Sequence, residues 1–307
     1  MKSPTAKQNG NPAPRAFVFN KDQIRDGYEE EINGRRRPRI NGLLRDWVSW
    51  QNSPEKHPFE IFKKVLARLS PPSVGDLGAL LPGEPTRIPD DSREIPTLAH
   101  PYGIVPFIYA SAGVQRIVSL AYLLVWAWHE HKINSAVSRR EPERRMVILV
   151  DEIEAHLHPQ WQRSILPALL EVSQDLDAEL QAQLVVATHS PLVMASVEPY
   201  FDAATDKLFL LDVDHELLGS EVNIKEIDFL KEGLVSSWLT SDVFGLEQAR
   251  SLEGERAVED ARRLQRMDSP PSEAIKEVSE RLKRYLPEIE GFWPRWMIFA
   301  DKHGVEL

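Results

Sequence analysis

The chain has 307 residues, of which 42% are hydrophobic and 27% are charged, an ordinary globular mixture that excludes wholesale disorder. The absence of cysteine excludes a disulfide framework, a thiolate metal site and a cysteine nucleophile. The 37 basic and 47 acidic residues give a net charge of −10, so bulk electrostatics does not support nucleic-acid binding and leaves such contact to a local patch.

The N-terminal segments are weakly patterned. Residues 1–15 are polar and proline-rich, which predicts a flexible N-terminus without the apolar core of a signal peptide. Ala16–Phe19 is a candidate strand, and Lys21–Ile32 fits a helix or a loop. Gly34–Arg39 carries four arginines, which favours a solvated turn over a phosphate-binding patch.

Two helices and an irregular segment follow. Leu43–Trp50 and Pro58–Leu69 have apolar residues at helical spacing. Residues 70–101 are rich in proline, glycine and aspartate, which predicts a loop with short strands.

The middle of the chain alternates between helical and strand patterns. Ala112–His131 is an almost wholly apolar helix, and its longest apolar run is well short of the roughly 20 residues of a membrane span, so we expect a cytoplasmic protein without membrane contact. Met146–Val150 consists of consecutive apolar residues, typical of a strand buried on both faces. The segments that follow are a helix (Gln160–Val172), a strand (Leu184–Ala187), a short helix (Pro191–Ser196) and a strand (Leu208–Leu211). Strands separated by helices predict a parallel sheet in an α/β layer.

The composition becomes helical from about Asp228. Leu246–Arg266 and Ser272–Tyr285 have amphipathic spacing, and Phe292, Trp293 and Trp296 favour a packing plug over a ligand site. We therefore predict three parts: the flexible N-terminus, a core over residues 16–227 and an α-helical subdomain over residues 228–307.

The first chemical motif is Asp151-Glu152, directly after the apolar strand. Open α/β folds bind ligands at the carboxyl ends of their strands. One carboxylate there can hold hydrated Mg²⁺ while its neighbour orients or deprotonates a water. An equally weighted alternative is that the two acidic residues cap a helix, because the helix dipole favours acidic side chains at a helix N-terminus.

Two further motifs belong to the same part of the chain. His189 follows the next strand, and parallel neighbouring strands would bring it to the same edge as Asp151, where an imidazole can contact a γ-phosphate. Ser111, Gly113 and Gln115 open the apolar helix, and a hydroxyl and glycine at a helix N-terminus make an anion site. Taken alone, these residues would indicate a serine cap with a glycine for packing.

Together the three motifs resemble the ABC-type (AAA family) ATPases, in particular the soluble RecF-, SMC- and OLD-like branch, in the order signature, Walker B, switch histidine. Ser111, Gly113, Gln115 and Arg116 match the signature Leu-Ser-Gly-Gly-Gln-Gln-Arg, although Ala112 and Val114 depart from it. The resemblance is clearest over residues 101–211.

The resemblance implies a P-loop NTPase core and an ATP- and Mg²⁺-dependent ATPase. In such an enzyme Asp151 helps hold Mg²⁺, Glu152 activates water and His189 senses the γ-phosphate. Ser111, Gly113 and Gln115 would bind ATP held by another protomer of a sandwich dimer.

The phosphate-binding Walker A loop G-x-x-x-x-G-K-[ST] is absent, because none of the 15 glycines is followed by lysine. In ABC-type proteins this loop lies upstream of the other motifs, so we expect a core that is incomplete on its N-terminal side and that self-associates or joins a Walker A-bearing partner chain. The alternative is a non-catalytic interaction subunit that retains the ABC half-fold.

Two weaker features leave alternatives open. His156 and His158 could bind metal, but a loop at a dimer interface is favoured. Asp212-Val213-Asp214 resembles the Asp-x-Asp of a Toprim nuclease, but a strand end entering a turn is favoured because no further run of strands follows.

Overall fold

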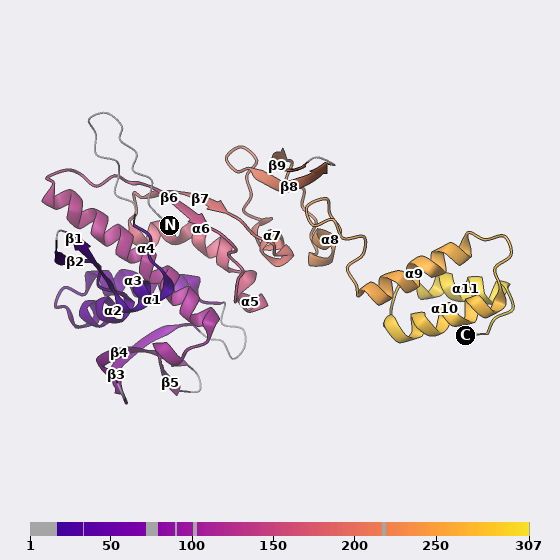
Figure 1. The fold of residues 1–307 in the computed structure, drawn as a ribbon, viewed down its shortest axis with the longest axis horizontal. Helices are drawn as coiled ribbons and strands as arrows, with labels where there is room; N and C mark the ends of the chain where they lie inside the picture. Colours follow the sequence, from indigo (N-terminus) through magenta and orange to yellow (C-terminus); the bar gives the residue numbers. More distant parts are fainter. Residues whose placement is uncertain are drawn as a thin grey trace. The chain divides into compact units, whose positions relative to one another are not determined.

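The computed structural model describes residues 17–32, 34–71, 79–89, 91–100, 103–216 and 219–306. The chain divides into two compact units, Met1–Phe201 and Asp202–Leu307, each described here by itself (Figure 1). The predicted flexible N-terminus, residues 1–15, lies outside the described residues. The predicted boundary at residues 227/228 lies inside the second unit and stays a prediction.

The first unit begins with a short helix and a hairpin of opposite charges. Helix α1 (Lys21–Asp26) is followed by strands β1 (Tyr28–Ile32) and β2 (Arg35–Ile40), which pair antiparallel. Glutamates of β1 lie opposite arginines of β2, and Arg39 forms an ion pair with Glu30 at 2.6 Å. The predicted turn at the arginine cluster is therefore wrong, because cross-strand charge pairing stabilises a strand there. Residues 17–19 have no regular structure, so the strand predicted there is also wrong.

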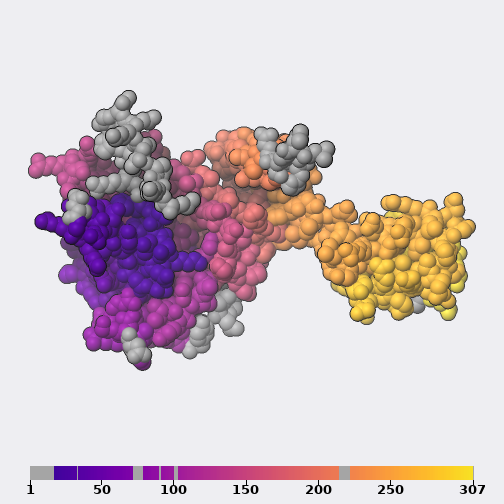
Figure 2. All heavy atoms as spheres, viewed as in Figure 1, coloured from indigo at the N-terminus to yellow at the C-terminus, as the bar shows by residue number. Residues whose placement is uncertain are grey.

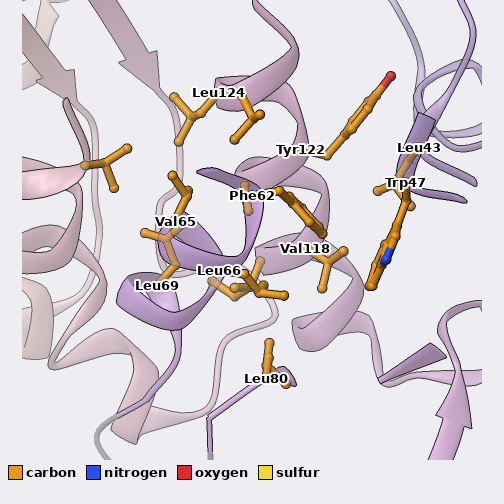
Figure 3. Close-up of a cluster of buried hydrophobic side chains, with 14 of the residues drawn as sticks. Leu43, Trp47, Phe62, Val65, Leu66, Leu69, Leu80, Val118, Tyr122 and Leu124 are labelled. Carbon is orange, nitrogen blue, oxygen red and sulfur yellow. The ribbon is translucent and has the colours of Figure 1, made fainter. Parts of the chain in front are cut away.

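The core of this unit is built by three predicted helices, which the structure confirms. They are α2 (Leu43–Asn52), α3 (His57–Leu69) and α4 (Ala112–Val137). Their apolar side chains meet in one interior (Figure 3). The helical spacing in α3 places Phe62, Val65 and Leu66 on one face, where each is completely buried.

Over residues 70–101, where a loop with short strands is predicted, the strands are confirmed, and they belong to a three-stranded antiparallel sheet. It consists of β3 (Leu81–Ile88), β4 (Asp91–His100) and β5 (Gly103–Pro106), in the order β3-β4-β5, and the 3₁₀ turn η1 (Phe107–Tyr109) follows. Pro82 and Pro85 lie on the edge strand β3, where a missing N–H is tolerated. Ile95 and Leu98 of β4 are fully buried, and this burial outweighs the loop-like composition. Residues 72–78 of the predicted loop lie outside the described residues.

The chain then forms a pair of parallel strands, β6 (Arg145–Val150) and β7 (Gln181–Val186), in register from end to end. Between them lie α5 (Pro159–Gln162) and α6 (Ile165–Leu176), and α7 (Pro191–Val197) follows. The single helix predicted over residues 160–172 is thus two helices. Salt bridges from Arg68 of α3 to Glu171 and Asp175 tie α6 to the helical core.

Among the described residues of the first unit, one face of this pair is covered. Ile148 is buried in the core, and Met146, Val150, Leu184 and Val186 are partly buried against it. On the opposite face Val147, Leu149 and Val185 are 61%, 74% and 50% exposed, so the prediction that β6 is buried on both faces is wrong for one of them. Within the described part of the chain, β6 and β7 pair with each other alone.

The second unit contains a hairpin and a group of helices. Strands β8 (Leu208–Glu216) and β9 (Gly219–Ile227) pair antiparallel, so the strand predicted at Leu208–Leu211 does not extend a parallel sheet in the described chain. Asp212-Val213-Asp214 lies within β8, which corrects the expected strand end. The short helix α8 (Val235–Leu239) follows the hairpin.

The last three helices share a core: α9 (Leu252–Gln265), α10 (Ser272–Tyr285) and α11 (Trp293–Lys302) (Figure 1). Their atoms are among the orange and yellow spheres of Figure 2. Trp296 is completely buried, and its Nε1 donates to Ser279 Oγ at 3.1 Å, which confirms the packing role predicted for it. No described helix of either unit is both long enough and apolar enough to cross a membrane.

Candidate functional site

The carboxyl ends of β6 and β7 bring the predicted catalytic segments together. Val150 lies opposite Val186, and the ladder continues beyond the strands, where Ala187 N–H donates to Val150 O at 2.9 Å. Asp151-Glu152 and Thr188-His189 therefore leave the same edge of the parallel pair, as the sequence predicted. Asp151, Glu152 and His189 are all exposed, so their side chains are accessible to a ligand.

The loop after β6, residues 151–158, has an unusual backbone. Glu152 and His156 have φ values of +48° and +62°, a left-handed conformation that is uncommon for residues other than glycine and that concentrates at functional sites. Ile153 and Leu157 are 2% and 6% exposed, so they anchor the loop in the core. The loop is held tightly while its first two carboxylates face outward.

The N-terminus of α4 packs against this same loop. Arg116 Nη2 donates to Glu152 O at 2.6 Å and to Asp151 O at 3.3 Å. A Cβ on Gly113 would lie 2.7 Å from His156 O, so only glycine allows this approach without a backbone shift. The structure thus brings the predicted signature and Walker B segments into contact within one chain.

Two other residues of the predicted signature, Ser111 and Gln115, make local hydrogen bonds. Ser111 caps α4, where its Oγ accepts from Val114 N–H at 3.4 Å. Gln115 Nε2 donates to Ala110 O at 2.9 Å and to Ile108 O at 3.2 Å. The serine cap and the glycine packing of the simpler interpretation are both present, so nucleotide contact by Ser111, Gly113 and Gln115 stays a prediction.

Sequence reasoning missed Glu154, which joins the two polar segments. Its Oε2 accepts from Thr188 Oγ1 and its Oε1 from His189 N–H, each at 2.6 Å. Partial burial would raise the pKa of the Glu154 carboxyl, but these hydrogen bonds together hold it below its ordinary value. The only signal in the sequence was a third carboxylate two residues after Glu152.

The residues considered as metal ligands, the two histidines of the loop and Asp151, differ in their surroundings. Within the described chain, no group of three or more histidine, aspartate or glutamate side chains is arranged to hold a metal ion. His158 Nδ1 instead accepts from Gln160 N–H at 3.3 Å and caps α5. Asp151 fits Mg²⁺ better, since this ion is commonly held by one or two carboxylates together with substrate phosphates and water.

The chain was compared with known families and proteins. A family model described as "AAA domain, putative AbiEii toxin, Type IV TA system" matches residues 28–195, more than half of the chain. The chain belongs to this AAA-domain family. The match confirms the predicted ATPase family and its α/β P-loop NTPase-like fold.

Individual relatives cover smaller parts. "Septu protein PtuA" of Bacillus thuringiensis is 25% identical over 149 residues, 48% of this chain and 34% of that protein. "Retron Ec83 probable ATPase" of Escherichia coli is 28% identical over 102 residues, 33% of this chain and 15% of that protein. The chain thus spans about a third or less of the length of these curated relatives. A solved structure of an SMC head bound to the C-terminal winged-helix domain of ScpA covers 55% of this chain and 42% of its own, with 20% identity and a TM-score of 0.30.

Proposed function

We propose that this chain supplies the Walker B, signature and switch-histidine part of an ATP-hydrolysing enzyme that works as a dimer with composite sites. The observation that carries the proposal is the parallel register of β6 and β7, which places Asp151-Glu152 and Thr188-His189 at one edge. Family membership supplies the reaction class, hydrolysis of ATP to ADP and phosphate.

The residues at this edge and at the N-terminus of α4 have distinct roles in the proposal. Glu152 orients and deprotonates the attacking water, a role that commonly contributes 10²–10⁴-fold to the rate. His189 contacts the γ-phosphate. Ser111, Gly113 and Gln115 of one protomer face the nucleotide held by the other, and the N-terminus of α4 favours the negative charge of a phosphate.

Asp151 is the residue that would hold Mg²⁺, which when bound supplies charge neutralisation on the phosphate oxygens. Its carboxylate is exposed at the strand end, and within the described chain it belongs to no group of three or more histidine, aspartate or glutamate side chains that could hold a metal ion. This donor set suits an ion whose remaining ligands are phosphate and water.

The Walker A loop that the sequence lacks would come from another polypeptide. Two features of the described chain support this part of the proposal. The parallel pair has unpaired outer edges, and one of its faces exposes Val147, Leu149 and Val185. Unpaired strands with exposed apolar side chains favour pairing with another chain. In the proposal, that chain adds strands to β6 and β7 and places its phosphate-binding loop beside Asp151. We place the assembly in the cytoplasm.

A second candidate function is a non-catalytic subunit that lends its half-fold to a partner. The internal hydrogen bonds of Ser111 and Gln115 favour this candidate, because they account for both side chains without a nucleotide.

The test begins with the DNA upstream of the coding region, read for a frame that encodes G-x-x-x-x-G-K-[ST]. That polypeptide is then co-expressed with this chain, and ATP hydrolysis is measured for each alone and for the pair. We expect little hydrolysis by residues 1–307 alone, and hydrolysis by the pair that Glu152→Gln lowers by roughly 10²–10⁴-fold. A pair that binds ATP but hydrolyses it equally with either residue at position 152 would favour the non-catalytic subunit.

A further inference from the structure

The segment that carries His189 is fixed to the Asp151-Glu152 loop by one side chain. We propose that Glu154 is a positioning residue, which holds the Thr188-His189 turn against this loop and thereby sets where the His189 imidazole stands. This inference rests on the proposed function and deepens it, because it names how the γ-phosphate contact is kept in place.

The contacts of Glu154 are those of a two-point clamp. One carboxylate oxygen accepts from a side-chain hydroxyl, Thr188 Oγ1, and the other from a backbone amide, His189 N–H, both at 2.6 Å. Hydrogen bonds to an ionised acceptor are shorter and stronger than neutral ones. The two bonds fix both the position and the orientation of the His189 peptide.

The clamp continues into the helix that follows. Thr188 Oγ1 also accepts from Ser190 N–H at 3.1 Å, and Ser190 Oγ donates to Gln162 Oε1 at 2.7 Å while it caps α7. The turn is therefore held through its backbone and through the side chains that flank His189. The imidazole itself stays exposed at the edge of the sheet.

The clamp starts from the loop that carries the proposed catalytic base. Glu154 lies two residues after Glu152, whose carbonyl is held by Arg116 at 2.6 Å and whose backbone is left-handed. Because the same tight loop presents Glu152 and clamps His189, the water-activating group and the phosphate contact keep a fixed mutual position. A simple cap on α7 would not need a residue from this loop.

Hydrogen exchange on the whole chain tests the clamp without nucleotide. Glu154→Ala and Thr188→Val each remove part of it, and we expect the amides of residues 187–190, 192 and 193 to exchange roughly tenfold faster or more. Thr188→Ser keeps the hydroxyl, and Glu141→Ala removes an exposed carboxylate elsewhere in the unit, so both should match the parent. Unchanged exchange of these amides in Glu154→Ala would overturn the proposal.

Kinetics of the assembled ATPase tests action through His189. We expect Glu154→Ala to lower kcat with little change in KM, and to have no further effect when His189→Ala is already present. Equal losses in both backgrounds would show that Glu154 acts independently of His189 and would overturn the proposal. If no assembly hydrolyses ATP, the proposed function fails, whereas the exchange experiment still decides whether Glu154 clamps the turn.

Discussion

The buried hydrogen bond between Tyr122 and Asp46 joins helices α4 and α2, and its removal should lower the stability of the first unit. Tyr122 OH donates to Asp46 Oδ2 at 2.8 Å, and Asn41 Nδ2 donates to Oδ1 at 3.0 Å. Tyr122 is completely buried and Asp46 is 6% exposed. Tyr122→Phe removes one hydroxyl and leaves the ring in place, so the change isolates the hydrogen bond.

The expected loss is about 1.5–3 kcal/mol in the free energy of unfolding at neutral pH, the range for a hydrogen bond to a charged group. Burial raises the pKa of the Asp46 carboxyl, while the bonds from Asn41 and Tyr122 oppose that rise. Without the hydroxyl, the pKa of Asp46 in the folded state rises further. The advantage of the parent over the variant is therefore complete above that pKa and shrinks as pH falls through it.

The assay is hydrogen exchange at increasing urea concentrations, read on peptides from residues 43–69 and 112–137 so that it reports the first unit alone. Tyr109→Phe is the matched control, because Tyr109 is 65% exposed, and it should stay within about 0.5 kcal/mol of the parent. A Tyr122→Phe loss no larger than that of the control, or one that is independent of pH, would refute the reasoning.

Three other changes test the site, the core of helices α9–α11 and the exposed face of β6. Glu152→Gln in the assembled enzyme should lower kcat by roughly 10²–10⁴-fold with ATP binding retained, measured by single-turnover hydrolysis and nucleotide titration; hydrolysis at the parent rate would contradict the Walker B assignment. Trp296→Ala should destabilise the α9–α11 core by about 3–5 kcal/mol, seen as faster exchange there but not in residues 43–69. Leu149→Gln, on a side chain that is 74% exposed, should change the stability of the chain alone by less than about 0.5 kcal/mol yet prevent copurification with the Walker A polypeptide. Undiminished copurification would contradict docking at this face.

The sequence by itself determined those helices and strands whose apolar residues recur at a regular spacing along the chain. The apolar spacing in α3 records which side chains leave water, because a helix repeats its faces every 3.6 residues, and the uninterrupted apolar run in β6 marks the position of a strand. The same run ends in Asp151-Glu152, so the sequence also located the polar edge. The family resemblance then rested on motifs of a few adjacent residues, and the family match confirmed it.

The sequence did not determine which segments pair or cover one another. The proline-rich residues after 79 form a sheet because Ile95 and Leu98 find a buried place, and β8 pairs with β9 because a neighbouring hairpin strand is available. Composition and periodicity describe a residue's tendency to be buried, but not its partner. For the same reason β6 looked buried on both faces while its structure leaves one exposed.

The tertiary structure alone decided how the polar residues of the site contact one another. Glu154 and Thr188 are 34 residues apart, and Arg116 and Glu152 are 36 residues apart, yet each pair is joined at 2.6 Å. Such bonds follow from the parallel register of two strands and the docking of a helix end on a loop. A hydrogen bond requires its donor and acceptor to be placed within tenths of an ångström, whereas a sequence pattern records only residue type and spacing. Glu154 was therefore recognised as a residue of the site only from the folded structure.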